Sequence, residues 1–276
     1  MTTLYVVGTP IGNLEDISLR ALRVLQEVAL IAAEDTRKTR ILLDHFQIRT
    51  PLTSYFEHNK LSKHDAILAA LADKDVALVS EAGMPGLSDP GYELIREAIA
   101  RDIRTVVVPG PSAVVSALVV SGLATDQFVY VGFLPRKGGE RRKFLESLAS
   151  ERRTVVALEA PHRVLDSLRD LLAVWGERRI CVARELTKLH EELFRGALSE
   201  ALAHFETHAP RGEFTFVVGG ASADTHRWDA RAIRARLAGL AGEGMQGQEA
   251  VKQVAIESGW RKRAVYAVWL NLKQEK

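Results

Sequence analysis

The stretch Leu4-Tyr5-Val6-Val7-Gly8-Thr9-Pro10-Ile11-Gly12-Asn13 joins an apolar run to a turn rich in glycine and proline. A short apolar run that stops at a glycine predicts a strand buried on both faces. Leu19, Leu22 and Leu25, which follow at helical spacing, predict a helix packed on that strand. Strand, turn and helix together form the unit from which parallel α/β sheets are built.

The same unit recurs along the first half of the chain. Val76-Ala77-Leu78-Val79 and Thr105-Val106-Val107-Val108 are further apolar runs, each followed by Gly- and Pro-rich sequence. They predict a parallel sheet covered on both faces. The second half contains strand patterns at residues 128–131, 154–157, 179–183, 192–196 and 214–218, separated by helical patterns. From Arg227 onward only helical spacing remains, with a helix-turn-helix outline.

This pattern predicts an α/β fold with two α/β domains and a small helical module. We expect an N-terminal α/β domain at residues 1–112, a second α/β domain at 113–222 and a basic helical tail at 223–276. Two such domains leave a cleft between them, which is a favoured place for a small-molecule site.

Composition and charge narrow the class of protein. The single cysteine, Cys181, rules out a disulfide within the chain and favours a reducing, cytoplasmic compartment, with Cys181 as a small core residue. No apolar stretch is long enough to predict a membrane span or a secretion signal. The segment from Arg227 to Lys276 carries ten basic and five acidic residues, whereas the rest carries 27 and 30. A basic tail of this kind indicates either a polyanion contact or a solvated helical face.

Several common nucleotide and metal motifs are missing from the sequence. The absence of G-x-x-x-x-G-K-[ST] argues against a P-loop hydrolase, and no G-x-G-x-x-G follows the first strand. The sequence has neither H-E-x-x-H nor paired C-x-x-C, so it predicts no catalytic metal.

Three polar turns fall where strands of the first domain end. They are Gly8-Thr9-Pro10-Ile11-Gly12-Asn13, Glu81-Ala82-Gly83-Met84-Pro85-Gly86-Leu87-Ser88-Asp89-Pro90-Gly91 and Pro109-Gly110-Pro111-Ser112-Ala113. Ligands of open α/β sheets bind at the carboxyl ends of strands, and glycine lets the backbone approach them closely. One such turn is commonplace, but three together indicate a binding site.

Six motifs in a fixed order now make a resemblance specific. They are Thr9-Pro10-Ile11-Gly12-Asn13-Leu14, Ala33-Glu34-Asp35-Thr36-Arg37, Ser88-Asp89-Pro90-Gly91, Pro109-Gly110-Pro111-Ser112-Ala113, Pro161-His162-Arg163 and Ala183-Arg184-Glu185-Leu186-Thr187-Lys188. Together they resemble the ribosomal RNA small subunit methyltransferase I family, a branch of the tetrapyrrole methylase superfamily. The resemblance covers residues 4–218, and the helical tail is similar to that family's C-terminal module.

The resemblance implies a fold of tetrapyrrole-methylase type that binds S-adenosylmethionine in the inter-domain cleft, in a homodimer. It implies 2′-O-methylation of a cytidine in the decoding region of 16S ribosomal RNA within the small subunit. Two motifs depart from the family pattern. Glu81 and Met84 replace the aspartate and threonine of Asp-Ala-Gly-Thr-Pro, and Ala160 replaces the serine of Glu-Ser-Pro-His-Arg. The first departure lengthens one acidic side chain of the second turn and replaces a hydroxyl with a thioether.

The strand-end turns, with parts of the second domain, are the predicted donor site. Backbone groups of the turns would hold the amino-acid tail and sulfonium, and the second domain would enclose adenine. The predicted donor-binding residues are Thr9, Pro10, Gly12, Glu81, Ala82, Gly83, Pro109, Gly110, Ser112, Leu134, Ala183, Leu186, Phe214 and Thr215.

A ribose hydroxyl is a poor nucleophile, so the reaction calls for a general base. Asp35 matches in position an aspartate given that kind of role in related methylases, with Glu34 and Glu81 as competitors. Asp35 is equally suited to cap the helix that begins at Thr36. Arg37 is expected to hold a phosphate or the ribose, or else to pair with Glu34.

RNA contacts should be mostly electrostatic. The predicted RNA-binding residues are Arg136, Lys137, Arg141, Arg142 and Lys143 in a flexible basic loop, with Arg261, Lys262 and Arg263 in the tail. Trp260 beside them either stacks on a base or packs in the tail core.

Two other functions stay open at this point. One is a methylase that acts on a tetrapyrrole carbon, which leaves the basic tail without a role. The other is a non-catalytic RNA-binding ribosome-assembly protein with a vestigial cleft, against which the complete set of strand-end turns argues.

Overall fold

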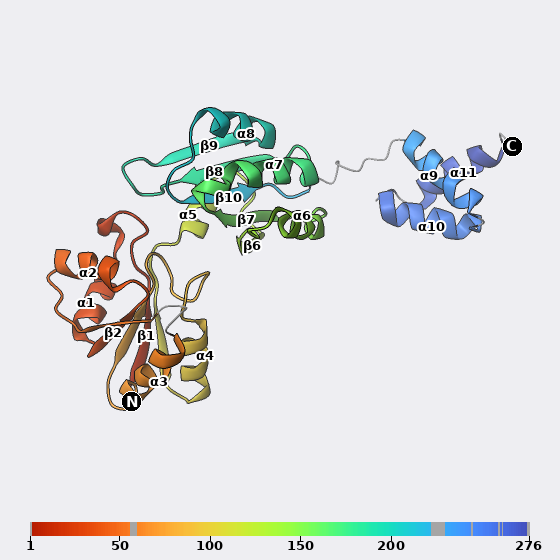
Figure 1. The fold of residues 1–276 in the computed structure, drawn as a ribbon. Helices are drawn as coiled ribbons and strands as arrows, with labels where there is room; N and C mark the ends of the chain where they lie inside the picture. The colour runs from red at the N-terminus through yellow and green to blue at the C-terminus, as the bar shows by residue number, and fades with distance from the viewer. Residues whose placement is uncertain are drawn as a thin grey trace. The chain divides into compact units, whose positions relative to one another are not determined.

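The computed structural model describes residues 2–55, 60–221, 230–243, 245–258, 260 and 262–274. Contacts within the chain divide it into two compact units, Met1–Gly220 and Ala221–Lys276 (Figure 1). The first unit contains two β-sheets, and the described residues of the second unit form helices, as the sequence predicted. In the described residues no helix combines the length and the apolarity that a bilayer crossing requires.

The first sheet has five strands in the order β3-β2-β4-β1-β5, and all of its pairings are parallel. Its strands are β1 (Thr3–Val7), β2 (Leu30–Ala33), β3 (Leu52–Ser54), β4 (Val76–Val79) and β5 (Arg104–Val108). The connections contain η1 (Leu14–Asp16), α1 (Leu19–Glu27), α2 (Thr36–His45), α3 (Lys60–Ala70) and α4 (Tyr92–Ala100). β4, β1 and β5 are neighbours, so the three glycine-rich turns leave the same edge of the sheet.

Alternation along each strand divides the core between the two faces of this sheet. Ile31 and Ala77 point to the face covered by α1 and α2. Their immediate neighbours in the strands, Ala32 and Val76, belong to the core on the other face, under α3 and α4. The predicted parallel sheet with both faces covered is therefore confirmed.

The second sheet is mixed, with the order β6-β7-β10-β8-β9. Only β6 and β7 are parallel, while β10 pairs antiparallel with β7 and β8, and β8 with β9. Its strands are β6 (Phe128–Phe133), β7 (Thr154–Glu159), β8 (Arg179–Arg184), β9 (Glu192–Ala197) and β10 (Phe214–Val218). Its helices are α6 (Gly138–Ser147), η2 (Pro161–Arg163), α7 (Val164–Trp175) and α8 (Leu198–Thr207). These helices pack on one face, where Phe216 and Phe205 are fully buried.

Helix α5 (Ala113–Val120) covers the other face of the second sheet. Val114, Ala117 and Leu118 from α5 pack against Cys181 and Val217. Burial raises the pKa of the Cys181 thiol, which keeps it a neutral core group as expected. The helix follows directly on β5 of the first sheet, so it joins the two sheets. Our boundary at 112/113 stays a proposal, and it falls at the first residue of this helix.

The second unit is a bundle of three helices, α9 (Ala230–Gly242), α10 (Gly247–Ser258) and α11 (Lys262–Gln274). Its core contains Ile233, Leu237, Val251, Val254, Val265 and Trp269. Trp260 packs against this core and is half-buried, which favours the packing role considered from the sequence over base stacking. The proposed tail boundary at 222/223 lies two residues beyond the division between the units.

Gly8 and Gly110 offer a test of how tightly the ends of β1 and β5 are packed. A Cβ atom at Gly110 would lie 2.8 Å from the carbonyl carbon and oxygen of Gly8, and both of these belong to the backbone. We predict that Gly110→Ala lowers the free energy of unfolding by about 1–3 kcal/mol, because overpacking forces the two backbones apart. Chemical denaturation measures this.

Gly139→Ala is the matched control for that substitution. Gly139 lies in α6, and nothing lies within 4 Å of a Cβ built there. Alanine also favours helix over glycine by up to about 1 kcal/mol, so this variant should be as stable as the native chain or more so. Equal stability of the Gly110 and Gly139 variants would show that the close approach of the Gly8 and Gly110 backbones does not affect the free energy of unfolding.

Candidate functional site

The three glycine-rich turns of the first sheet are bonded to one another through their backbones. The Thr9 N–H donates to the Gly83 carbonyl over 2.9 Å, and the Gly83 N–H donates back to Thr9 over 3.1 Å. Gly83 has a φ of 77°, a left-handed conformation that glycine adopts without strain. The Gly8 N–H donates to Val108 over 3.0 Å, which ties the third turn to the first.

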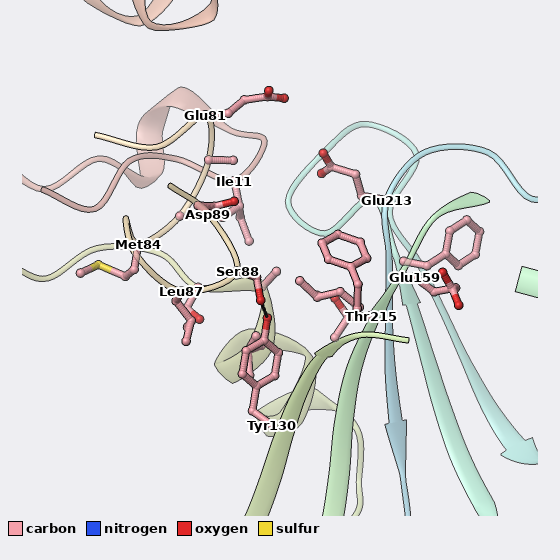
Figure 2. Close-up of a pocket in the computed structure, with 18 of the residues that line it drawn as sticks. Ile11, Glu81, Met84, Leu87, Ser88, Asp89, Tyr130, Glu159, Glu213 and Thr215 are labelled. Carbon is pink, nitrogen blue, oxygen red and sulfur yellow. Dashed lines mark hydrogen bonds between the residues drawn. The ribbon is translucent and has the colours of Figure 1, made fainter. Parts of the chain in front are cut away.

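These turns form one wall of a cavity of about 480 Å³, and the second sheet forms the other wall (Figure 2). Among the predicted site residues, those that line the cavity are Glu34, Glu81, Ala82, Gly83, Ser112, Phe214 and Thr215. Several other lining residues were not predicted from the sequence as site residues, notably Ile11, Ser88, Asp89, Tyr130, Glu159 and Glu213. Ser88 and Asp89 lie in a recognised motif, and that motif was the available signal.

Other predicted donor-site residues lie behind this wall or beside it. Thr9, Pro10, Gly12, Pro109, Gly110, Leu134, Ala183 and Leu186 are not part of the cavity lining. Leu134 and Ala183 are buried in the two cores of the second sheet. Thr9 is 3% exposed, and its hydroxyl is a buried oxygen with no hydrogen-bond partner in the described part of the chain. Direct donor contact by this group stays a prediction.

Two of the recognised motifs also contact each other, through Gly12 and Asn13 of the first motif. The Asn13 N–H donates to the Thr187 hydroxyl over 3.1 Å. A Cβ atom at Gly12 would lie 2.8 Å from that hydroxyl oxygen and 3.0 Å from the Leu186 carbonyl oxygen. Glycine at position 12 therefore allows the first turn to contact the loop between β8 and β9. The contact adds a second connection between the halves of the first unit.

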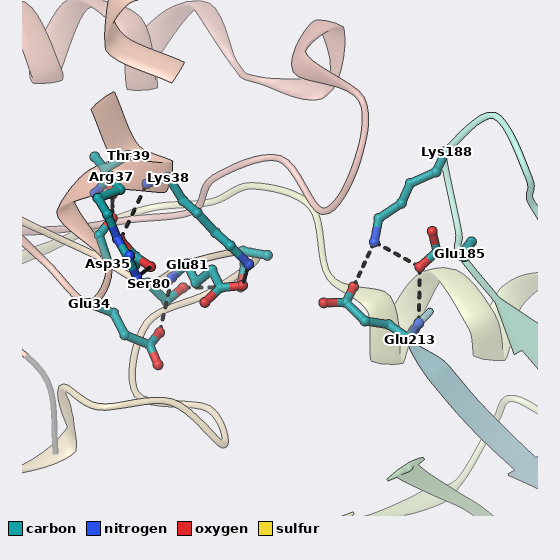
Figure 3. Close-up of polar contacts among 11 residues, drawn as sticks. Glu34, Asp35, Arg37, Lys38, Thr39, Ser80, Glu81, Glu185, Lys188 and Glu213 are labelled. Carbon is teal, nitrogen blue, oxygen red and sulfur yellow. Dashed lines mark hydrogen bonds and ion pairs between the residues drawn. The ribbon is translucent and has the colours of Figure 1, made fainter. Parts of the chain in front are cut away.

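An ion-pair cluster holds the loop between β8 and β9 in place (Figure 3). The Lys188 ammonium lies 2.9 Å from Glu185 and 3.1 Å from Glu213, which precedes β10. The Glu185 carboxylate also accepts the Glu213 N–H over 3.0 Å. Glu213 lines the cavity, so this cluster fixes one side of its rim.

Carboxyl groups dominate the charge of the cavity. Burial raises the pKa of Glu34, against a backbone hydrogen bond from the Glu81 N–H at 3.0 Å that favours its charged form. Burial, with the charges of Glu34 and Glu81, raises the pKa of Asp89 to about 7. Glu81 forms an ion pair with Lys38 at the rim (Figure 3). Near neutral pH the cavity is therefore acidic, and it contains one carboxyl group that is close to its titration point.

Two further contacts shape the side of the cavity that belongs to the second sheet. The hydroxyls of Ser88 and Tyr130 lie 2.6 Å apart, joining the second turn to β6 (Figure 2). Glu159 is 1% exposed and is paired with Arg163 over 2.6 Å. Its carboxylate also accepts the Ser167 hydroxyl and the Ala160 N–H, so its charge is fully compensated. Glu159 therefore has a positioning role at the end of β7.

Asp35 lies outside the cavity lining and caps helix α2. Its carboxylate accepts the Arg37 N–H over 2.8 Å and the Lys38 N–H over 3.4 Å. The Arg37 guanidinium also donates to it over 3.2 Å, and this contact lowers the pKa of Asp35. Arg37 pairs with Asp35, not with Glu34 as the alternative supposed. Catalysis by Asp35 stays a prediction, and the capping role is what the structure describes.

The predicted RNA-binding residues differ in exposure. Arg136, Lys137, Arg142 and Lys143 are exposed, as are Lys262 and Arg263 in α11. Arg141 is 5% exposed, and its guanidinium lies 2.7 Å from Asp170 in α7. This burial is at odds with direct RNA contact by Arg141. Helix α6 begins at Gly138, so part of the expected flexible loop is helical. Arg261 lies outside the described residues.

The family of the chain follows from comparison with known proteins. A model of the Tetrapyrrole (Corrin/Porphyrin) Methylases matches residues 3–202. A protein of Synechocystis named ribosomal RNA small subunit methyltransferase I is 46% identical over 278 residues, covering 100% of both chains. A protein of Thermotoga maritima with the same name is 52% identical and covers 80% of this chain and 99% of its own. The chain belongs to the tetrapyrrole methylases, in the branch of the ribosomal RNA small subunit methyltransferase I proteins.

Solved structures agree on the fold of the first unit. A cobalt precorrin-4 methyltransferase has a TM-score of 0.61 at 16% identity, covering 79% of this chain and 94% of its own. A diphthine synthase has a TM-score of 0.60 at 14% identity, covering 79% and 90%. At such low identity the likeness establishes the fold alone. In the described part of the chain, no three His, Cys, Asp or Glu side chains are grouped as a metal site.

The raised pKa of Asp89 predicts a pH dependence of stability. With a folded pKa of about 7, the native chain holds a proton that the unfolded chain has released, so stability falls as pH rises through 7. We predict that Asp89→Asn flattens the loss of stability between pH 6 and pH 8, as measured by chemical denaturation at each pH. Asp126→Asn, at an exposed loop position, is the control and should keep the native slope. An unchanged slope in Asp89→Asn would mean that Asp89 is already ionised at pH 6.

Proposed function

We propose that this chain transfers a methyl group from S-adenosylmethionine to the 2′ oxygen of a cytidine in the decoding region of 16S ribosomal RNA. The relatives named ribosomal RNA small subunit methyltransferase I support RNA as the substrate. The observation that carries the proposal is the acidic cavity between the strand-end turns and the second sheet. Assembled small subunits in the cytoplasm are the proposed substrate, because they would present the target ribose in a fixed shape.

The cavity fits the proposed donor in size and charge. Its volume of about 480 Å³ lies in the usual range for small-molecule sites. Its carboxyl groups Glu34, Glu81 and Asp89 suit a ligand that carries a sulfonium and an ammonium group. Met84, Leu87 and other apolar residues would pack against adenosine.

S-adenosylmethionine, when bound, supplies an activated methyl group. Positive charge on its sulfur disperses during transfer, so the protein chiefly has to align the reactants and exclude water. Backbone groups of the turn at Ala82 and Gly83 and the first turn of α5 would hold the donor. The apolar side chains of the second sheet would keep water away from the transfer.

Glu34 is the residue best placed to accept the proton of the ribose hydroxyl. It lines the cavity, and burial raises its pKa toward the range in which a general base works at neutral pH. Asp35 points its carboxylate into the first turn of α2 and has a lowered pKa, which makes it a weaker base. In this proposal Asp35 keeps α2 and Arg37 in position.

We also propose a homodimer, as the family resemblance implies. Val115 and Val119 lie four residues apart on α5, on one helical face, and are 51% and 68% exposed. Val107 on edge strand β5 is 55% exposed. Exposed apolar groups of this kind favour contact with another protein surface, here a second copy of the chain.

The alternatives from the sequence have less support. The solved tetrapyrrole methylases share too little sequence with the chain to support a tetrapyrrole substrate. A purely structural RNA-binding protein has no need for a cavity lined by buried carboxyl groups with raised pKa values.

Nucleoside analysis tests the proposed function directly. Purified protein, incubated with the donor and with small subunits from cells that lack the enzyme, should produce one 2′-O-methylcytidine per subunit by mass spectrometry. Ala113→Phe should fill the cavity and remove both donor binding and product, whereas Ala203→Phe on the exposed face of α8 should change neither. Methylation of a base, or no product with bound donor, would contradict the proposal.

The choice of base can be tested by comparing two variants. Glu34→Gln removes the proton acceptor with little change of shape, so we expect kcat to fall by about 10²–10⁴-fold. Asp35→Asn still caps α2, because asparagine is as good an N-cap as aspartate, and should keep kcat within a few fold. Single-turnover methylation of small subunits measures both. The reverse order of effects would assign the base to Asp35.

A further inference from the structure

A second concave surface lies beside the cavity, on the first sheet. It is a groove of about 570 Å³, open to solvent and lined by three cationic and three hydroxyl side chains. The cations are Arg37, Arg40 and Lys63, and the hydroxyls belong to Thr36, Thr53 and Ser54. We call it the α2–β3 groove. It shares none of its residues with the cavity, and none of the basic segments singled out for RNA binding contributes to it.

Three elements bring these side chains together. Arg37 and Arg40 are three residues apart in α2, so they project from the same side of that helix. Thr53 and Ser54 end β3, the edge strand of the first sheet. Lys63 is supplied by α3, which follows that strand. The groove therefore lies at the same carboxyl edge of the sheet as the strand-end turns.

The charge of the groove is positive and accessible. The Arg37 side chain is 91% exposed even though it pairs with Asp35. Arg40 is exposed, and within the described residues neither Arg40 nor Lys63 has an ion-pair partner. The two N–H groups at the start of α2 are already bonded to Asp35, so the side chains and not the helix end define the site.

This set of groups matches a sugar–phosphate backbone. Arginine, lysine, serine and threonine side chains are the usual partners of phosphate oxygens, and such contacts fix the register of a nucleic acid without reading its sequence. An open, polar groove with one apolar residue, Leu52, has little to offer a base or a small apolar ligand. Its three cations would neutralise neighbouring phosphates and release their counterions.

The groove is also next to the proposed reaction site along the chain. Glu34 lines the cavity and Thr36 lines the groove, and two residues of chain span at most about 7 Å. Asp35 between them is bonded to the α2 backbone, which keeps the two walls in a fixed relation. A strand whose ribose enters the cavity would therefore leave it along this groove.

We propose that the α2–β3 groove binds the phosphates of the ribosomal RNA strand next to the methylated nucleotide. This inference rests on the proposed function and adds a substrate-binding site to it. The groove places the target ribose over Glu34.

The test removes two charges that lie away from the proposed base. The double variant Arg40→Ala/Lys63→Ala should bind a decoding-region RNA fragment at least tenfold more weakly in low salt. The slope of log affinity against log salt should become shallower by about 1.4–1.8, the value for two lost phosphate contacts. On small subunits, kcat/KM should fall while donor affinity stays unchanged.

Lys74→Ala/Arg104→Ala is the matched control, because it removes the same charge from the opposite edge of the sheet. Lys74 precedes β4, Arg104 begins β5, and both are exposed. Equal loss of affinity in the two double variants, or an unchanged salt slope in the groove variant, overturns the proposal. A lower kcat/KM on subunits with native affinity for the RNA fragment assigns the groove to a ribosomal protein and also overturns it.

The binding measurements separate this inference from the proposed function. Failure of the native chain to form 2′-O-methylcytidine would overturn the function, and the salt slopes would still show whether the groove binds RNA. A methylating enzyme whose RNA affinity ignores Arg40 and Lys63 would leave the function intact and remove the groove.

Discussion

The packing of α5 on the second sheet is the interaction on which the rest of the first unit depends. The helix leaves the first sheet at β5, yet its buried residues Val114, Ala117 and Leu118 belong to a core built from β7, β8 and β10. Burying apolar surface of this helix stabilises the contact between the two sheets, because each Å² of apolar surface removed from water contributes about 25 cal/mol of free energy. The first turn of this helix is also part of the cavity wall. Stability and the binding site are therefore built from the same residues.

Electrostatics in the cavity follow from this arrangement. Glu34 and Glu81 follow the neighbouring strands β2 and β4, and Asp89 closes the second turn, so three carboxyl groups converge where strands end. Glu81 is paired with Lys38, whereas neither Glu34 nor Asp89 has an ion-pair partner among the residues that the structure describes. Burial and mutual repulsion then raise the pKa values of Glu34 and Asp89. A few residues farther along the chain, Arg37 and Arg40 give the same edge of the sheet a positive charge. The negative charge of the cavity suits a cationic donor, and the positive charge of the groove suits an anionic strand.

Much of the fold was predictable, because the spacing of apolar residues and the positions of Gly- and Pro-rich turns indicate the same strands and helices. The strands around Val6, Leu78 and Val107 and the helical character of the tail were predicted from spacing alone, and the structure confirms them. The sequence did not reveal β3 (Leu52–Ser54), because three residues are too few to show an alternation of apolar and polar side chains. It also did not reveal that β8 runs antiparallel to β9 and β10. Strand direction depends on pairing between distant segments, which local pattern does not record.

The site was only partly predictable, for a similar reason. Turns at strand ends identified Glu81, Ala82, Gly83 and Ser112. Leu134 and Ala183 belong to recognised or neighbouring motifs but lie in cores, and Arg141 is buried against Asp170. Motif membership does not say which way a side chain points, and a basic run does not say which of its members is exposed. The groove beside α2 combines residues from three elements and has no linear signature at all.

The reciprocal backbone bonds between Thr9 and Gly83 have a consequence for how this protein family can vary. Main-chain atoms fix the shape of the second turn, so the identities of Glu81 and Met84 are free to drift without altering its path. Replacement of the family's threonine by methionine at position 84 would change how this side of the cavity packs against a ligand. It would not change whether the turn forms. Single substitutions in this turn can therefore change which ligand the cavity prefers while the backbone of the turn keeps its shape.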